Sequence, residues 1–206
     1  MSFSRYPVAV LVSGDGSNLQ AIVDAAREPT YGADVVAVIS DRPDVKALDR
    51  AAGAGIPTEV IDWDDFDSRD QFSVAICDAV ARHRAEALVL AGFMRVLAPV
   101  AIDRFPNRIV NIHPALLPSF PGAHAVRETL AYGTALTGVT VHFVDEEVDH
   151  GPIIYQEAVP VLADDDEASL HARIREVEHR VYPVVVDALG TGALVVHGRR
   201  VVWRDR

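Results

Sequence analysis

The sequence has one cysteine, and it lacks both a metal-ligand pattern and a long apolar segment. Cys77 cannot form an internal disulfide, and no metal-ligand spacing accompanies it, so we expect no bound metal. No apolar run approaches the roughly 20 residues of a membrane-spanning helix. The first apolar run, residues 8–12, is too short for a signal peptide, and Ser13 and Gly14 interrupt it. We therefore expect a cytoplasmic protein that does not contact membranes.

Basic residues are also scarce. The chain has 19 Lys and Arg against 30 Asp and Glu, which gives a formal net charge of −11. Sequence-independent binding to nucleic acid requires basic side chains against phosphates, so we expect no nucleic-acid partner. A small anionic substrate remains compatible with this charge, because backbone amides and a few placed cations can bind it locally.

What the sequence does contain is an alternation of apolar strands and helical patterns. The chain has 206 residues and no repeat or linker, so we expect a single domain over residues 1–206. β-Branched apolar runs at 8–12, 34–39, 58–61 and 87–90 alternate with helical patterns, including those at 45–54 and 67–83. Such strands indicate a mostly parallel sheet with helices on both faces, a Rossmann-like α/β fold. Ligands of these sheets bind outside the carboxyl ends of the strands.

The second half of the chain has shorter strands and more loop. A strand at 109–113 leads into a Pro-rich loop at 114–122 and then a helix at 125–132. Strands at 138–144 and 152–159 are joined by the acidic turn 145–150. A helix over 167–189, which Pro183 is expected to kink, precedes a hairpin at 195–202 with its turn near Gly198.

A glycine-rich loop, residues 13–18, lies between the first strand and the first helix. Glycines allow a tight turn there, and the free amides and positive dipole end of a helix N-terminus suit a phosphate. The loop is neither a P-loop nor a full dinucleotide fingerprint. The alternative is an ordinary strand-to-helix turn in which Ser17 or Asn18 caps the helix.

Asn111 and His113 are the strongest catalytic candidates. Strand alternation puts both on one face at the carboxyl end of residues 109–113. An Asn amide and a protonated His can donate to a developing oxyanion, and the His can carry protons. The alternative is that both side chains only anchor the Pro-rich loop. Asp149 is a solvated turn residue unless the fold brings it to His113, whose pKa it would then raise.

Residues 92–97 follow the fourth strand. Met94 and Leu97 on either side of Arg95 suit a flat apolar ring that carries a carboxylated tail, although a loop packing its own apolar residues is an alternative. Glu178, on a helix, is by itself a solvated charge.

Taken together, these motifs carry a resemblance to a known family. Ser13-Gly-Asp-Gly-Ser-Asn-Leu-Gln20, Ala91-Gly-Phe-Met-Arg-Val-Leu97, Asn111-Ile-His-Pro-Ala-Leu-Leu-Pro118 and Asp149 before Gly151-Pro152 occur in this order. Over nearly the whole chain the sequence resembles the folate-dependent glycinamide ribonucleotide formyltransferases. The resemblance implies the formyltransferase fold. It also implies transfer of a formyl group from 10-formyltetrahydrofolate to the amine of glycinamide ribonucleotide, in de novo purine (IMP) biosynthesis.

The resemblance further implies a role for individual positions. The N-terminal part would bind the ribonucleotide, and the C-terminal part would bind the folate and carry the catalytic residues. The implied catalytic residues are Asn111, His113 and Asp149. The implied substrate-binding residues are Gly16, Ser17, Asn18, Leu19, Gln20 and Glu178. The implied cofactor-binding residues are Arg69, Met94, Arg95, Val96, Leu97 and Asn111. No metal is implied.

We expect Asn111 and a protonated His113 to stabilise the oxyanion, with Asp149 keeping His113 charged and helping to move a proton through a water molecule. Two positions depart from the family pattern. Asp15 places a carboxylate beside the expected phosphate, and we expect its side chain to point to solvent. His150 stands where the family often has glycine after the catalytic aspartate.

Three alternatives remain at this stage. A formyltetrahydrofolate hydrolase shares the Asn, His and Asp but would be expected to carry a further N-terminal domain. A methionyl-tRNA formyltransferase would be expected to carry a basic C-terminal domain. A noncatalytic nucleotide- or folate-binding module would bind ligand without turnover. The sequence leaves open whether the protein is a monomer or a homodimer.

Overall fold

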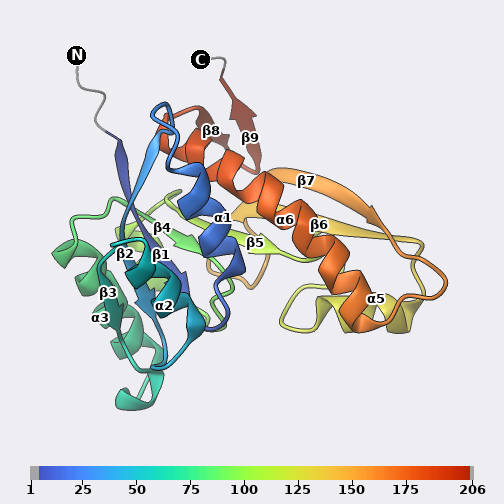
Figure 1. Cartoon of the computed structure of the whole chain (residues 1–206), viewed down its shortest axis with the longest axis horizontal. Coiled ribbons are helices and arrows are strands. Elements are labelled where there is room, and N and C mark those ends of the chain that lie inside the picture. The colour runs from blue at the N-terminus through green and yellow to red at the C-terminus, as the bar shows by residue number, and fades with distance from the viewer. Residues whose placement is uncertain (1–4, 205–206) are drawn as a thin grey trace.

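The protein folds around one nine-stranded sheet, seen in a computed structural model that describes residues 5–204. The strand order is β3-β2-β1-β4-β5-β6-β7-β9-β8 (Figure 1). The strands are β1 (Tyr6–Val12), β2 (Ala33–Ser40), β3 (Thr58–Val60), β4 (Ala87–Leu90), β5 (Ile109–His113), β6 (Leu136–Phe143), β7 (Ile153–Pro160), β8 (Leu194–His197) and β9 (Arg200–Trp203).

Parallel pairing joins the first five strands, from β3 to β5. β6 then pairs antiparallel with both β5 and β7, and the β8–β9 hairpin joins β7 through a parallel bridge between Ile153 and Arg200. The order reverses direction between β1 and β4, because the chain first adds β2 and β3 on one side of β1 and then β4 and β5 on the other. The carboxyl ends of β1 and β4 therefore form a switch point, where ligands of open α/β sheets bind.

Helices cover both faces of the sheet (Figure 1). They are α1 (Ser17–Ala25), α2 (Lys46–Gly53), the 3-10 turn η1 (Trp63–Asp65), α3 (Arg69–Arg82), α4 (Pro99–Arg104), α5 (Ala125–Tyr132) and α6 (Glu167–Gly190). Strand alternation divides the core between the two faces. In β1, Val8 and Val10 pack in the cluster that holds residues of α1 and α6, whereas Ala9 and Leu11 pack in the cluster that holds residues of α3.

The expected α/β, Rossmann-like fold is confirmed. Each expected strand is present, and its ends lie within two residues of the expected ends. Two short elements, η1 and α4, lie in segments where the sequence indicated no helix. α6 continues past Pro183 to Gly190, and the hairpin turn falls at Gly198, which has φ +60°. Between residues 5 and 204, no helix is both long and apolar enough to cross a bilayer.

Candidate active site

A cavity of about 400 Å³ lies beside the carboxyl ends of β4 and β5. Its wall combines the loop after β4, the end of β5, the loop before α5 and the loop between β6 and β7. Residues that line it include Met94, Leu97, Asn111, His113, Gly122, His142, Val148 and Asp149. Apolar walls with a few convergent polar groups are typical of small-molecule sites.

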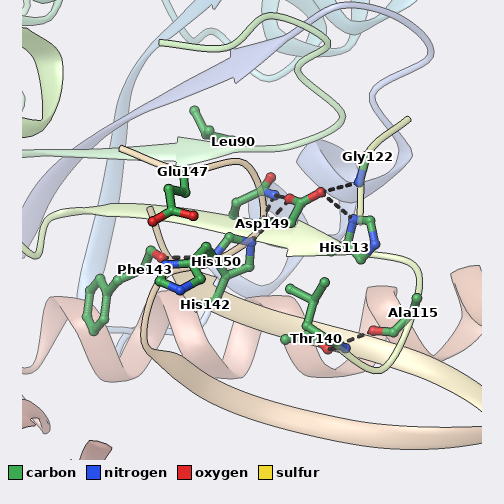
Figure 2. Close-up of polar contacts among 12 residues, drawn as sticks. Leu90, His113, Ala115, Gly122, Thr140, His142, Phe143, Glu147, Asp149 and His150 are labelled. Atoms are coloured by element: carbon green, nitrogen blue, oxygen red, sulfur yellow. Dashed lines mark hydrogen bonds and ion pairs between the residues drawn. The ribbon is translucent and has the colours of Figure 1, made fainter. Parts of the chain in front are cut away.

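The fold brings Asn111, His113 and Asp149 together at this cavity. Asp149 Oδ2 accepts a hydrogen bond from the Gly122 backbone amide (2.7 Å) and lies 3.3 Å from His113 Nδ1. Asp149 Oδ1 accepts a longer bond from Asn111 Nδ2 (3.4 Å). Figure 2 shows the Asp149 carboxylate between Gly122 and His113. The sequence left this proximity open, because His113 and Asp149 are 36 positions apart in the chain.

His142 joins the same group from the neighbouring strand. Its Nδ1 lies 2.8 Å from the Phe143 carbonyl oxygen, an acceptor, so Nδ1 carries the proton. The other ring nitrogen, Nε2, is 3.2 Å from Asn111 Nδ2 and 3.6 Å from Asp149 Oδ1. In the neutral ring Nε2 accepts from Asn111, which fixes the side-chain amide with its N–H groups toward Asp149. His142 thus orients Asn111.

His113 is buried, with 3% of its surface exposed, and this changes the expected charge state. Burial lowers the pKa of His113 below its ordinary value, although the Asp149 carboxylate and the hydrogen bond to the Phe120 carbonyl both raise it. The direction of this pKa shift favours a neutral His113 in the free protein, whereas the expected mechanism uses the protonated ring. Asp149 acts in the expected direction, but desolvation of the ring outweighs it.

Asp149 itself remains ionised at neutral pH. Burial raises the pKa of its carboxyl, but the neighbouring His142 and His113 rings and the hydrogen bond from the Gly122 amide together bring it below the ordinary value. Two acceptors, the Phe120 carbonyl and the Asp149 carboxylate, thus face the two nitrogens of His113. A protonated His113 satisfies both, so the site is built to stabilise the imidazolium once a proton arrives.

The glycine-rich loop ends at the N-terminus of α1 as the sequence predicts. Gly16, not Ser17 or Asn18, is the N-cap; it has φ +75°, and a Cβ there would lie 2.6 Å from Ala47 Cβ. Gln20 N bonds to the Gly16 carbonyl, which leaves the amides of residues 17–19 as the open donors of the first turn. The Leu19 side chain is fully buried in the core, so any role of Leu19 in binding is limited to its backbone.

Asp15 does not simply point to solvent. Its carboxylate pairs with Lys46 Nζ (2.9 Å) and Arg50 (3.0 Å), both from α2, and these contacts lower its pKa. Arg50 Nε also donates to the Asp15 carbonyl. The carboxylate that departs from the family pattern is therefore neutralised by two cations, and it holds them at the edge of the loop.

Glu178 is buried and faces the same loop. Its Oε2 accepts a 2.9 Å hydrogen bond from Asn18 Nδ2, and 6% of the residue is exposed. Burial raises the pKa of Glu178, while the Asn18 hydrogen bond and the charge of Arg175 lower it less. Glu178 is thus not a solvated helix charge. A buried carboxylate with one protein donor has capacity to accept hydrogen bonds from a ligand hydroxyl.

Residues 94–97 line the cavity, as expected for a cofactor loop. The Met94 side chain is 62% exposed, and Leu97 is 6% exposed. Arg95 is engaged inside the protein: Nε bonds to the fully buried Asp41 at 2.8 Å, and the guanidinium lies 4.8 Å from the Trp63 ring centroid. Arg69 is exposed at the start of α3, outside the cavity wall, and its assignment stays a prediction.

Hydrogen bonds link the two halves of the site. Ser13 Oγ accepts from the Met94 amide (2.8 Å), which ties the glycine-rich loop to the cofactor loop. The Tyr182 hydroxyl lies 2.8 Å from the Leu90 carbonyl and 3.0 Å from the Val110 carbonyl, which ties α6 to the ends of β4 and β5. Both groups of predicted residues therefore belong to one connected edge of the sheet.

Several residues of the cavity wall were missed. His124, before α5, and Glu167 and His171, in the first two turns of α6, also line the wall. An Asp at position 166 followed by Glu167 marks a helix start, but the sequence carries no signal for which site that start faces. Within residues 5–204, no group of three or more His, Cys, Asp or Glu side chains is placed to hold a metal ion.

The fold and the site define a class of protein, and comparison of the chain with known proteins identifies that class. Residues 6–186 match the model of the formyl transferase family, and the chain belongs to that family. The phosphoribosylglycinamide formyltransferase of Escherichia coli (strain K12) is 41% identical over 198 residues, which cover 96% of this chain and 93% of that protein. The crystal structure of glycinamide ribonucleotide transformylase 1 from Symbiobacterium toebii has a TM-score of 0.95 and 44% identity, covering 98% of this chain and 95% of that one.

Similarity extends to longer and to functionally different proteins. The trifunctional purine biosynthetic protein adenosine-3 of Gallus gallus is 43% identical over 202 residues, 98% of this chain, but the chain spans only 20% of that protein's length. A formyltetrahydrofolate deformylase structure from Pseudomonas syringae pv. tomato has a TM-score of 0.91 at 27% identity, covering 99% of this chain and 67% of that one. Shared fold alone therefore does not decide which molecule accepts the formyl group.

Proposed function

We propose that the protein transfers the formyl group of 10-formyltetrahydrofolate to the amine of glycinamide ribonucleotide, giving formylglycinamide ribonucleotide and tetrahydrofolate in purine biosynthesis. The observation that carries the proposal is the Asp149 carboxylate, held among Asn111, His113 and Gly122 at a cavity that reaches the 94–97 loop. Higher identity to the phosphoribosylglycinamide formyltransferase of E. coli (41%) than to the deformylase (27%) supports the ribonucleotide as acceptor.

Residues 1–206 would act as one domain with two binding regions. The cavity suits a folate in size, since small-molecule pockets occupy roughly 300–1,000 Å³, and Met94 to Leu97 offer an apolar wall for a flat ring. The amides of residues 17–19, with Lys46 and Arg50 nearby, would hold the phosphate. Glu178 and Asn18 would accept and donate hydrogen bonds to the ribose. The net charge of −11 supports small-molecule partners in the cytoplasm rather than nucleic acid.

Asn111, His113 and Asp149 divide the chemistry. When bound, 10-formyltetrahydrofolate supplies the formyl group. Asn111 Nδ2, oriented by His142, would exchange its long 3.4 Å hydrogen bond to Asp149 for one to the formyl oxygen as negative charge develops there. His113, neutral because it is buried, would accept the proton that the attacking amine loses. Asp149 and the Phe120 carbonyl would then stabilise the imidazolium, and the same proton would be returned to the leaving nitrogen.

The test is consumption of 10-formyltetrahydrofolate by the purified protein, followed spectroscopically, with and without glycinamide ribonucleotide. Consumption that requires the ribonucleotide, with formylated product by mass spectrometry, supports the transferase. Consumption without it identifies a hydrolase, and binding without consumption identifies a noncatalytic module.

Two variants test the assigned roles. We expect His113→Ala and Asp149→Asn each to fold normally and to lose about 10²–10⁴ in kcat, the range for a positioned acid–base group. Circular dichroism and thermal unfolding check the fold. Turnover within tenfold of the parent protein in either variant contradicts the mechanism.

A further inference from the structure

The loop that carries Asp149 is held from outside the active site. This loop, residues 144–152, joins β6 to β7, and Asp149 adopts a left-handed backbone conformation with φ +52°. Such a conformation is strained for a residue other than glycine and persists only when the surroundings fix it. One support is Gly151, where a Cβ would lie 1.9 Å from the Phe143 carbonyl oxygen. The middle of the loop is exposed, with Val148 at 52%.

A second support comes from the far end of the sequence. Arg199 lies in the turn of the β8–β9 hairpin, and its Nη2 donates a 2.5 Å hydrogen bond to the carbonyl oxygen of His150. Its Nη1 lies 3.4 Å from Nδ1 and 3.3 Å from Nε2 of the His150 ring. Arg199 therefore contacts the side chain of His150 as well as its carbonyl oxygen.

His150 is in turn fixed within the loop. Its Nδ1 lies 2.8 Å from Asp145 Oδ2, so Nδ1 carries the proton and donates to the carboxylate. Asp145 also accepts from the Glu147 amide (3.1 Å). The hairpin itself is anchored beside the loop, because Arg200 pairs with Ile153 and Trp203 Nε1 donates to the Ile154 carbonyl at 3.1 Å.

We propose that Arg199 is a positioning residue for the active site: by holding the His150 peptide, it fixes the left-handed backbone of Asp149 and so the direction of the Asp149 carboxylate. The carboxylate must meet Gly122, Asn111 and His113, which all lie on β5 or the loop that follows it. Asp149 itself belongs to a different loop, so its reach depends on how that loop is held. The positive guanidinium also offsets an acidic segment that contains Asp145, Glu146, Glu147 and Asp149.

This inference rests on the proposed function, and it explains why histidine is accepted after Asp149. A glycine at position 150 would leave the peptide free to rotate. The His150 ring instead contacts both Asp145 and Arg199, so side-chain contacts add to the hydrogen bond that holds this peptide.

The test compares Arg199→Ala with Arg200→Ala, a matched control that removes an exposed arginine of the same hairpin. We expect Arg199→Ala to lower kcat about tenfold, less than the roughly 10²-fold that a misplacement of 1 Å can cause. The KM values for both substrates and the melting temperature should stay at those of the control. Arg199→Lys, which keeps a donor for the His150 carbonyl, should recover part of kcat. His150→Ala, which keeps the carbonyl, should lose less than Arg199→Ala.

A second readout needs no turnover, so it separates failure of this inference from failure of the proposed function. Asp149 raises the pKa of His113, whereas the neighbouring His142 lowers it. If Arg199→Ala releases the carboxylate, NMR titration of the His113 ring should give a lower pKa than in Arg200→Ala. Equal kcat and equal His113 titration in the two variants overturn the inference. Absence of transferase activity in the parent protein overturns the proposed function instead.

Discussion

Replacing Glu178 with glutamine should stabilise the fold and weaken ribonucleotide binding at the same time. Burial raises the pKa of the Glu178 carboxyl, so the charged form is costly in the folded protein without substrate. Asn18 Nδ2 donates to Glu178 Oε2, while Asn18 Oδ1 is buried and has no hydrogen-bond partner within residues 5–204. Glutamine keeps an oxygen for Asn18 Nδ2 and adds an N–H that can reach Asn18 Oδ1.

The magnitude follows from these two contacts. An unsatisfied buried acceptor costs about 1–3 kcal/mol, and we expect the variant to recover about 1 kcal/mol of it, or about 2–4 °C in melting temperature for a chain of this size. The gain depends on pH. Below the ordinary pKa of 4.5 both states of the parent protein hold the proton and the gain is smallest. As pH rises, the unfolded state ionises first, so the parent loses stability relative to the variant.

The assay is thermal unfolding of Glu178→Gln and the parent at a series of pH values from about 5 to 8, with Glu176→Gln as control. Glu176 is an exposed glutamate of the same helix and should show no such gain. The KM for glycinamide ribonucleotide should rise about tenfold or more, because a hydrogen bond to a charged group contributes about 1.5–3 kcal/mol. A variant less stable than the parent at pH 8 refutes the burial argument, and an unchanged KM refutes the substrate contact.

Two further predictions concern the cofactor loop and the acid limit of activity. Arg95→Ala should lower the free energy of unfolding by about 3 kcal/mol, because it removes the main partner of the fully buried Asp41 carboxylate. Chemical denaturation measures this free energy, and a decrease of less than about 1 kcal/mol contradicts the prediction. Because burial lowers the pKa of His113 below its ordinary value of 6.5, kcat should hold through neutral pH and fall only at pH values below 6.5. An acid limb centred above pH 7 contradicts a neutral, buried His113.

Much of the fold follows from local pattern. Three of the four apolar runs of the first half, β1, β2 and β4, are buried strands because each carries apolar residues on both faces, which only a sheet covered on both sides can bury. The fourth, β3, is an edge strand, and its Val60 is 41% exposed. The pairing of Asn111 and His113 on one face follows from the two-residue period of a strand. The short helix Pro99–Arg104 escaped notice because six residues are too few to show a helical period.

What could not be predicted are contacts between distant segments. Asp149 reaches His113 through a turn whose left-handed backbone has no signature in an Asp-His sequence. Asp15 looked like an unpaired charge beside a phosphate because Lys46 and Arg50 lie more than thirty residues away in sequence. Leu19 shares a motif with Asn18, yet adjacent helix positions face different directions, and only one of the two side chains reaches the site.

Two hydrogen bonds join the glycine-rich loop to the cofactor loop. Ser13 stands at the end of β1, and its hydroxyl accepts from the Met94 amide in the loop after β4. The Ser13 amide also donates to the Gly92 carbonyl at 3.2 Å. These two contacts fix the glycine-rich loop relative to the cofactor loop before either ligand binds. A transfer between two small molecules gains most from such preorganisation, because a misplacement of about 1 Å can lower the rate by 10². Loss of the Ser13 hydroxyl should therefore raise the KM of both substrates together, although Ser13 is 6% exposed and is itself no part of the cavity wall.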